Sequence, residues 1–293
     1  MNAVADDDCP ADDDAVEHTN DEGCWRNQVV RRFMKADGHG FDVVSFAKKV
    51  SIVFQDKMVI DVGSGTGILS MFIIELPFGI EKVNNSFANY LLTSSSRSGW
   101  DTASSTSACS NTVLYARDKW LTPEGDVFPD KAKLFIAAIE DRQYKEDKIN
   151  LVAITEPLVD VVDNNQVVAG NYCVKEIDLY TVQIADLAWT SEFVLRMNRN
   201  DYVQALVTYF TVEFSNCHKR TGFSTGPDSQ YTHWKQTVFY LQDALTVKKG
   251  EELKGVFTCS ANARNERDLD FKIMVSFHGE VCDLEEESTY TMH

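Results

Sequence analysis

The spacing of apolar and polar positions changes along the chain and divides it into regions of different character. Met58–Val62 holds four apolar residues in five, and the glycine-rich segment Gly63–Gly67 and an apolar helix start at Ile68–Phe72 follow it. A short apolar run of this kind is typical of a buried strand in a parallel sheet. Because glycines have no Cβ atom, the backbone can turn sharply there and a ligand can approach it closely. The pattern predicts a strand–turn–helix unit whose helix amides face a ligand, although a turn without a ligand has the same pattern.

From Glu156 onward the pattern changes to a succession of short strands. Asn-, Gly- and Pro-rich segments such as Asp163–Asn165 and Thr221–Pro227 separate the apolar runs. Many short strands with turn signals between them predict an antiparallel barrel or sandwich. The expected strands are Val159–Val162, Val174–Tyr180, Phe193–Met197, Val203–Phe214, Thr237–Leu241, Leu253–Cys259 and Leu269–Phe277. The fold class is therefore predicted as α/β plus all-β.

The region between these two parts is mixed. Thr93–Ser110 contains eleven Ser or Thr among 18 residues, and such a stretch is expected to be a flexible loop. Asn111–Leu121 has the spacing of a helix that Pro123 and Gly125 would close. We expect residues 1–40 to be an acidic, disordered tail and linker, residues 41–128 a truncated α/β domain and residues 129–293 a β domain.

The net charge of −17 is concentrated at the start of the chain. Residues 1–23 contain seven Asp, two Glu and no Lys or Arg, which leaves −8 for the remainder. An acidic block of this kind is usually a solvated tail. The acidic remainder argues against direct, phosphate-driven binding of nucleic acid and favours cationic protein partners.

The cysteines and the N-terminal sequence limit the cellular compartment and the cofactor class. The seven cysteines are scattered without a CxxC pair, so we expect reduced thiols and no metal site. No apolar run is long enough to cross a membrane, and the N-terminus lacks the pattern of a secretory signal. The sequence thus predicts a protein of the cytosol or nucleus with no membrane association.

Several segments together resemble the protein arginine N-methyltransferases, most closely the predominant type I eukaryotic enzymes. They are DVGSGTGILSMF from Asp61, NTVLYARDKWLTPEGDVFPD from Asn111, IEDRQYK from Ile139, and the run from Arg199 to Tyr240 that contains THWKQ. The resemblance implies a partial Rossmann-like domain that binds S-adenosylmethionine, followed by a β-barrel. It also implies asymmetric dimethylation of arginine in Arg/Gly-rich proteins and histones, in the nucleus and cytoplasm, by a homodimer.

The same resemblance assigns roles to individual residues. Asp61, Gly63, Gly65 and Gly67 match the family's cofactor-binding positions, and His233 and Trp234 match the loop that lines its substrate side. For Trp234 a packing role in the β domain is equally consistent with the sequence, and His233 alone is not a catalyst. Tyr202, Tyr209 and Phe210 are expected in the core of the β domain.

The chemistry of the family requires carboxylates that this chain lacks. Two carboxylates grip the arginine guanidinium bidentately and orient the nitrogen that accepts the methyl group. The family provides them as two glutamates in a loop of the form SExMGYxLxxE, immediately before the NTVLYARDKW helix. Here Asn84–Ser110 occupies that place and contains a single acid, Asp101, so no catalytic residue is recognisable. The family's dimerisation arm is likewise missing between Ile149 and Val152.

Three interpretations follow from these losses. The chain is an active methyltransferase, a catalytically inactive paralogue or truncated isoform that acts as a binding or regulatory subunit, or an intact enzyme whose gene model has lost exons. The flanks of each gap match the family closely, which favours skipped or mispredicted exons over gradual divergence. Transcript reads across codons 70–112 that contain the double-glutamate loop would establish the third interpretation.

Overall fold

The part of the chain that can be described lies in one compact unit, His39–His293. The computed structural model describes residues 59–62, 88–93, 107–141, 155–217, 220–232, 234–265 and 268–293. The predicted acidic tail falls outside these ranges. Within them, no helix has the length and apolarity needed to span a bilayer.

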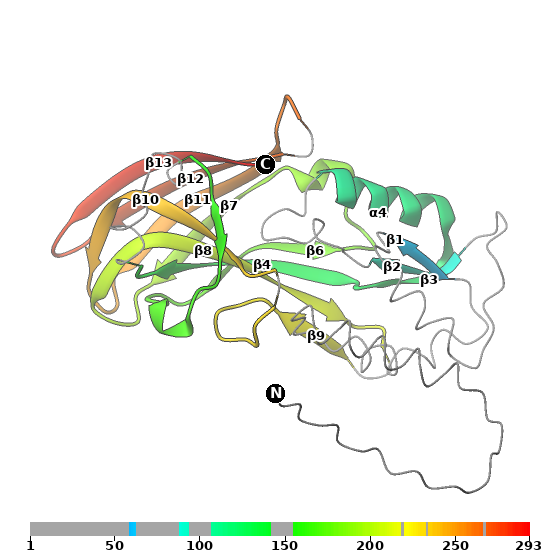
Figure 1. The fold of residues 1–293 in the computed structure, drawn as a ribbon, viewed down its shortest axis with the longest axis horizontal. Helices are drawn as coiled ribbons and strands as arrows, with labels where there is room; N and C mark the ends of the chain where they lie inside the picture. Colours follow the sequence, from blue (N-terminus) through cyan, green and yellow to red (C-terminus); the bar gives the residue numbers. More distant parts are fainter. Residues whose placement is uncertain are drawn as a thin grey trace, which may run out of the picture. The chain divides into compact units, whose positions relative to one another are not determined.

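Three parallel strands form the first sheet (Figure 1). They are β1 (Val59–Val62), β2 (Ala88–Thr93) and β3 (Leu121–Phe128), hydrogen-bonded in that order. Helix α4 (Ser107–Trp120) lies between β2 and β3 in the chain and contacts all three strands. Parallel neighbours cannot be joined by a tight turn, and a crossover helix is their usual connection. The α/β part of the predicted fold class is therefore confirmed.

The serine- and threonine-rich segment is not a loop throughout. Thr93 ends β2 and Ser107–Ser110 form the first turn of α4, so the predicted loop Thr93–Ser110 is wrong at both ends. Ser and Thr are poor residues for a helix interior because their hydroxyls compete for backbone groups. They are favoured at a helix start, where the first N–H groups have no acceptor within the helix.

Pro123 and Gly125 lie inside β3 and do not close a helix as predicted. The ladder between β2 and β3 pairs Ala88 with Leu121 and next pairs Tyr90 with Asp126, so its register shifts between these two pairs. Proline has no N–H to donate to a ladder, and such an irregularity is where a strand tolerates it. The helix consequently ends at Trp120.

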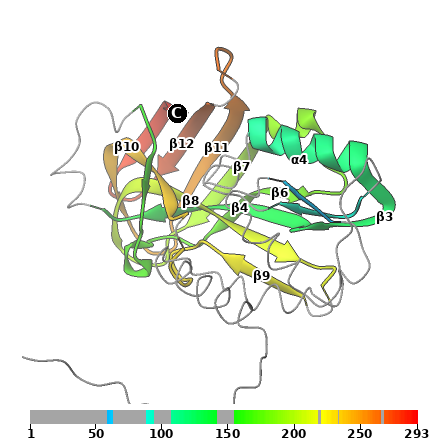
Figure 2. The same ribbon diagram turned by 45° about the vertical axis from the view of Figure 1, so that its right-hand side comes forward.

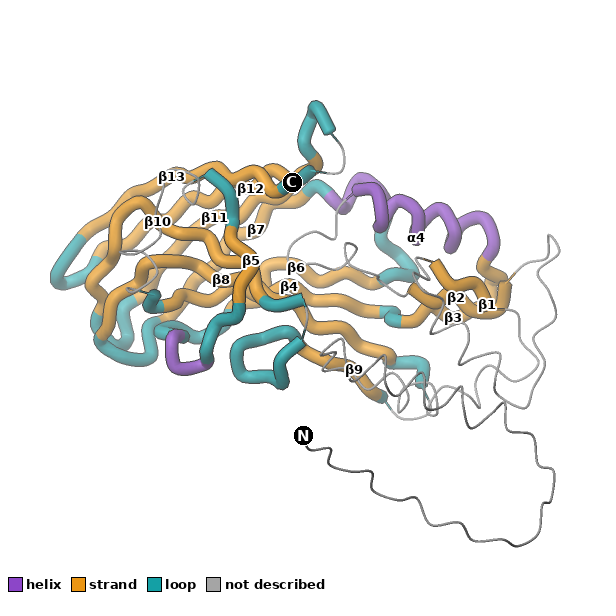
Figure 3. Tube along the Cα trace, in the orientation of Figure 1, coloured by secondary structure: helices purple, strands orange, loops and turns teal. Residues whose placement is uncertain are grey.

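The rest of the described chain forms two antiparallel sheets (Figures 1 and 3). The larger sheet has the order β5-β10-β8-β4-β6, with β9 paired to β8, and the smaller one has the order β13-β12-β11-β7. The larger sheet comprises β4 (Lys131–Ile139), β5 (Leu158–Asp160), β6 (Tyr172–Asp178), β8 (Asp201–Phe214), β9 (Thr221–Ser224) and β10 (Gln236–Val247). The smaller sheet comprises β7 (Trp189–Arg196), β11 (Glu252–Ala261), β12 (Leu269–His278) and β13 (Asp283–Met292). Two short 3-10 helices, Asn164–Gln166 and Ile184–Leu187, lie in the connections.

Each of the seven strands expected after Glu156 overlaps an observed strand, whereas β9 and β13 were not predicted. Tyr209 and Phe210 are buried as expected. Tyr202 is 42% exposed, so its assignment to the core is wrong. It is the second residue of β8, and Val203, the next residue along the strand, is the one that is buried in the core.

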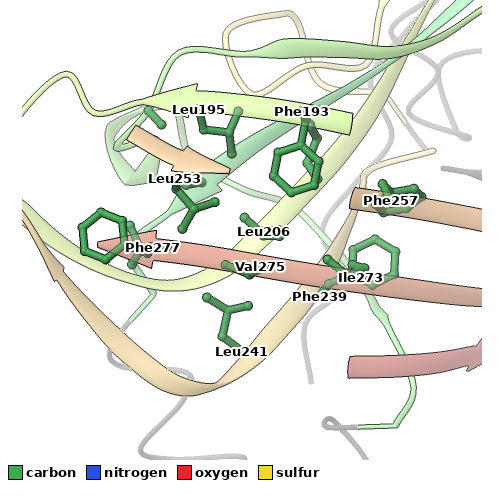
Figure 4. Packing of buried hydrophobic residues seen from close by; sticks show 14 of the residues in the cluster. Phe193, Leu195, Leu206, Phe239, Leu241, Leu253, Phe257, Ile273, Val275 and Phe277 are labelled. Atoms are coloured by element: carbon green, nitrogen blue, oxygen red, sulfur yellow. The ribbon is translucent and has the colours of Figure 1, made fainter. Parts of the chain in front are cut away.

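The two sheets share one hydrophobic core, which Figure 4 shows from close by. Leu206 and Phe239 come from the larger sheet, and Phe193, Phe257 and Phe277 come from the smaller one. Phe239 makes an edge-to-face contact with Phe257, with ring centroids 5.6 Å apart. Aromatic pairs of this geometry add to the free energy gained by burial. Because this core covers one face of the smaller sheet, its strands β7 and β12 alternate between more and less buried residues, whereas β8 of the larger sheet has a continuous buried run.

β10 of the larger sheet lies beside β13, the red C-terminal strand of the smaller sheet (Figure 2). The Tyr290 hydroxyl donates to the Tyr240 carbonyl oxygen at 2.8 Å, and the Gln242 amide donates to the Glu286 carboxylate. No strand ladder joins β10 to β13 among the residues described. The all-β part is thus a pair of sheets around a common core, in the arrangement expected of a β-barrel domain.

Candidate functional site

The carboxyl ends of the three parallel strands lie at one edge of the first sheet. Asp61 is registered with Leu92, and Leu92 is registered with Phe128, so these residues form one row across the sheet. In open parallel sheets, ligands bind outside this edge. Asp61 therefore lies at this edge, near the carboxyl end of β1, whereas Gly63, Gly65 and Gly67 lie outside the described residues.

At the same edge the chain passes from the parallel sheet into the β part. β3 ends at Phe128, a cis peptide bond links Phe128 to Pro129, and the side chain of Asp130 is buried. The Asp130 carboxylate accepts hydrogen bonds from the backbone amide and the hydroxyl of Ser215. Its amide donates to the Glu213 carbonyl at 3.1 Å. Through these hydrogen bonds Asp130 connects this edge of the parallel sheet to the end of β8. The sequence alone did not predict this contact.

A second polar cluster joins β3 to the segment after β6 and to Asn216, which follows β8. The Tyr180 hydroxyl donates to the Asp126 carboxylate and accepts from the Val127 amide and the Asn216 side chain. Burial, together with the neighbouring Asp126 charge, raises the pKa of Tyr180 to about 12. The Tyr180 hydroxyl therefore stays protonated and neutral at physiological pH, and its hydrogen bonds are structural.

Helix α4 is attached to the β part by a buried guanidinium. One terminal nitrogen of Arg117 donates to the carbonyl oxygens of Leu179 and Val182, each at 2.8 Å. Both acceptors lie in the connection after β6. Apolar residues of α4 and of the larger sheet, including Leu114 and Phe210, form a common core beside this contact.

The predicted substrate-side loop packs against the same core. Trp234 stacks on Phe223 with ring centroids 5.2 Å apart and meets Phe210 edge to face at 5.9 Å. Thr232 is buried, and its carbonyl accepts a hydrogen bond from the amide of Lys235 at 3.2 Å. His233 lies outside the described residues. The packing role that the sequence left open for Trp234 is thus present in the structure.

The two acids beside the junction between the parallel sheet and the β part, Asp126 and Asp130, each take part in hydrogen bonds with neighbouring side chains. The Asp130 carboxylate accepts a hydrogen bond from Ser215, and the Asp126 carboxylate accepts hydrogen bonds from Tyr180 and Asn216. Asp101 lies outside the described ranges. Among the described cysteines, Cys173, Cys217, Cys259 and Cys282 are not in disulfides. The described residues contain no group of three metal-ligating side chains.

Comparison with known proteins decides the family. Residues 130–280 match the family model of the arginine methyltransferase oligomerization subdomain. Protein arginine N-methyltransferase 1 of Caenorhabditis elegans is 50% identical over 303 aligned positions, which cover 83% of this chain and 84% of the relative. The chain belongs to the protein arginine N-methyltransferase family. Protein arginine N-methyltransferase 8-B of Danio rerio is 46% identical, with 82% of this chain and 68% of the relative covered.

Solved structures of the family have the same fold. A chain of the Trypanosoma brucei PRMT1 enzyme–prozyme heterotetrameric complex with AdoHcy matches with a TM-score of 0.79 and 29% identity, covering 90% of this chain and 98% of that chain. Arabidopsis thaliana protein arginine methyltransferase 10 matches with a TM-score of 0.74 at 16% identity, covering 88% of this chain and 97% of that one. The predicted membership of the methyltransferase family and its two-part fold are confirmed.

Proposed function

We propose that this chain takes part in the type I reaction of its family, the transfer of methyl groups from S-adenosylmethionine to arginine, giving asymmetric dimethylarginine. Its own contribution is to bind the cofactor and the substrate, because the double-glutamate loop that transfer requires is absent from the sequence. The proposed substrates are Arg/Gly-rich proteins and histones, and the proposed compartments are the nucleus and cytoplasm. The row formed by Asp61, Leu92 and Phe128 supports the proposal, because Asp61 lies near the carboxyl ends of the strands, and parallel sheets bind ligands outside that edge. The AdoHcy in the Trypanosoma brucei complex supports the same cofactor class.

Residues at this edge have the chemistry that the cofactor needs. Asp61 would face its cationic groups, and Gly63, Gly65 and Gly67 would let the backbone approach it. When bound, the cofactor supplies an already activated methyl group. The protein therefore contributes mainly position and electrostatics. The substrate side would include His233 and Trp234, and the acidic surface would attract an arginine-rich partner.

Cofactor binding can be tested separately from methylation. Isothermal titration of the purified chain with S-adenosylmethionine is expected to show micromolar binding. Gly65→Val should abolish it, because a branched side chain would occupy the space that the cofactor's approach requires. Gly170→Ala is the matched control, since no atom lies within 4 Å of the added Cβ. Absence of binding by the unmodified chain would contradict the proposed cofactor site.

A second candidate is a non-catalytic subunit that binds or regulates an active family member. Two observations favour it. The sequence lacks the double-glutamate loop, and the matched Trypanosoma brucei structure pairs an enzyme with a prozyme. Mixing the chain with an active arginine methyltransferase and measuring methylation of an Arg-Gly-Gly peptide tests this candidate. A rate above that of the active enzyme alone supports it, and an unchanged rate argues against it.

A further inference from the structure

We propose that Gln236 is a positioning residue that holds the loop Gly226–Lys235, and with it Trp234, in one conformation on the substrate side. This inference rests on the proposed function, because it assumes that the loop meets an arginine-bearing peptide. Gln236 is 7% exposed and begins β10 directly after the loop. The backbone of Gln236 belongs to the ladder between β10 and β5, but it is the side chain of Gln236 that connects the two ends of the loop.

The side-chain amide of Gln236 uses both of its polar atoms. Its Nε2 donates to the carbonyl oxygen of Thr225 at 2.6 Å, and its Oε1 accepts from the amide of Val162 at 2.8 Å. Thr225 immediately precedes the loop, so the first bond closes the loop at its base. Val162 follows β5, so the second bond ties that base to the edge of the larger sheet.

Thr225 is in turn hydrogen-bonded to the backbone of Phe210 in β8, a central strand of the larger sheet. It is 1% exposed, and its amide donates to the Phe210 carbonyl oxygen at 2.9 Å. Its hydroxyl lies 3.0 Å from the Phe210 amide nitrogen and 3.1 Å from the Phe210 carbonyl oxygen. The ring of Phe210 contacts the indole of Trp234. One residue of β8 therefore holds the beginning of the loop through its backbone and Trp234 near the end through its side chain.

The loop contains conformations that need such support. Lys235 has a φ of 55°, in the left-handed region that is unfavourable for residues other than glycine. Gly226 packs so closely that an added Cβ would lie 2.9 Å from the ring of Tyr209. The Asn171 amide in turn holds the Tyr209 hydroxyl at 2.7 Å. The loop is therefore held at its start by the packing of Gly226 on Tyr209 and near its end by the contact of Trp234 with Phe210. The hydrogen bond from Gln236 to Thr225 connects the residues that flank these two contacts.

Two substitutions at this position separate its two hydrogen bonds. Gln236→Met keeps a similar volume and removes both bonds. Gln236→Glu keeps an acceptor for Val162 and loses the donor to Thr225, which protonation of the carboxyl would restore at acidic pH. Gln204→Met is the matched control. Gln204 is 3% exposed and its Oε1 also accepts a backbone amide, that of Asp141 at 3.0 Å, but it lies away from the loop.

The experiment compares three readouts in the full chain. Hydrogen–deuterium exchange of residues 226–235 reports the loop, and titrations report affinity for an Arg-Gly-Gly peptide and for S-adenosylmethionine. Gln236→Met should raise exchange in the loop and raise the peptide dissociation constant about tenfold, the size expected for a lost buried hydrogen bond. Cofactor affinity should stay the same, which a general loss of structure would not allow. Gln236→Glu should show the same defects at neutral pH and recover in part at acidic pH.

The outcomes distinguish the inference from the proposed function. Unchanged loop exchange, or unchanged peptide affinity in both Gln236 variants, would overturn the inference. An equal effect of Gln204→Met on exchange in the loop would also overturn the inference, because the loss of any buried side-chain amide would then disturb the loop. An unmodified chain that binds no peptide contradicts the proposed substrate class before any variant is compared, and the exchange data then still decide whether Gln236 holds the loop.

Discussion

The indole ring of Trp234 lies almost parallel to the phenyl ring of Phe223, with an interplanar angle of 18°. Phe223 belongs to β9, and Trp234 belongs to the loop that the family resemblance places on the substrate side. A single side chain thus contributes both to the core beside α4 and to the proposed substrate surface. Changes at Trp234 will therefore alter stability as well as binding.

We predict that Trp234→Ala lowers the free energy of unfolding by about 3 kcal/mol, because it removes a large aromatic side chain from a packed cluster. Trp234→Phe, which keeps an aromatic ring, should recover more than half of this loss. Urea unfolding followed by circular dichroism measures both values. A stability within about 0.5 kcal/mol of the unmodified chain for Trp234→Ala would show that the stacking on Phe223 contributes little.

Arg117 should be important for the attachment of α4. Arg117→Met leaves two buried carbonyl oxygens, those of Leu179 and Val182, without their donor, and is expected to cost about 3 kcal/mol. Arg117→Lys should recover part of this loss, because an ammonium can reach at least one acceptor. Asp118→Ala is the control, since that side chain is 62% exposed and its ion pair with Arg117 adds little. Equal losses for Arg117→Met and Asp118→Ala in urea unfolding would contradict this account.

The stability of the β part is expected to fall at alkaline pH. Burial raises the pKa of Tyr290 from 10.0 to about 12, and its hydroxyl donates to the Tyr240 carbonyl. The folded chain therefore retains a proton that the unfolded chain loses. This contribution to stability is fully present below pH 10 and is lost as the pH rises from 10 to 12. Tyr290→Phe should weaken this dependence when unfolding free energies are compared across that range, and an unchanged dependence would contradict it.

Strands with one buried face were predictable from the sequence. β12 alternates between buried and exposed residues along its length, and its bounds, Leu269–His278, match the predicted strand closely. β13 has the same alternation, but the consecutive acids Glu285–Glu287 mask it because one of them points partly inward. β2 was missed because it ends within the Ser- and Thr-rich stretch. Pattern alone therefore fails where charged or hydroxyl residues occupy strand positions.

Individual candidate residues of the site could be predicted from the sequence, but the contacts between residues from different strands could not. The glycine-rich segment after Asp61 indicated a ligand edge, but the row through Leu92 and Phe128 depends on a strand that the sequence did not reveal. The partners of Trp234 and Gln236 come from other strands, so no local pattern could identify them. Gln236 stands within the THWKQ segment, yet only the structure shows which groups its amide joins.

The central claim is that this chain retains the fold and the cofactor edge of an arginine methyltransferase while lacking the carboxylates that hold the arginine. The direct test is methylation of an Arg-Gly-Gly peptide by the purified 293-residue chain with labelled S-adenosylmethionine. The account predicts no detectable transfer, because nothing in the sequence replaces the paired glutamates that orient the guanidinium. Robust, cofactor-dependent formation of asymmetric dimethylarginine would contradict it.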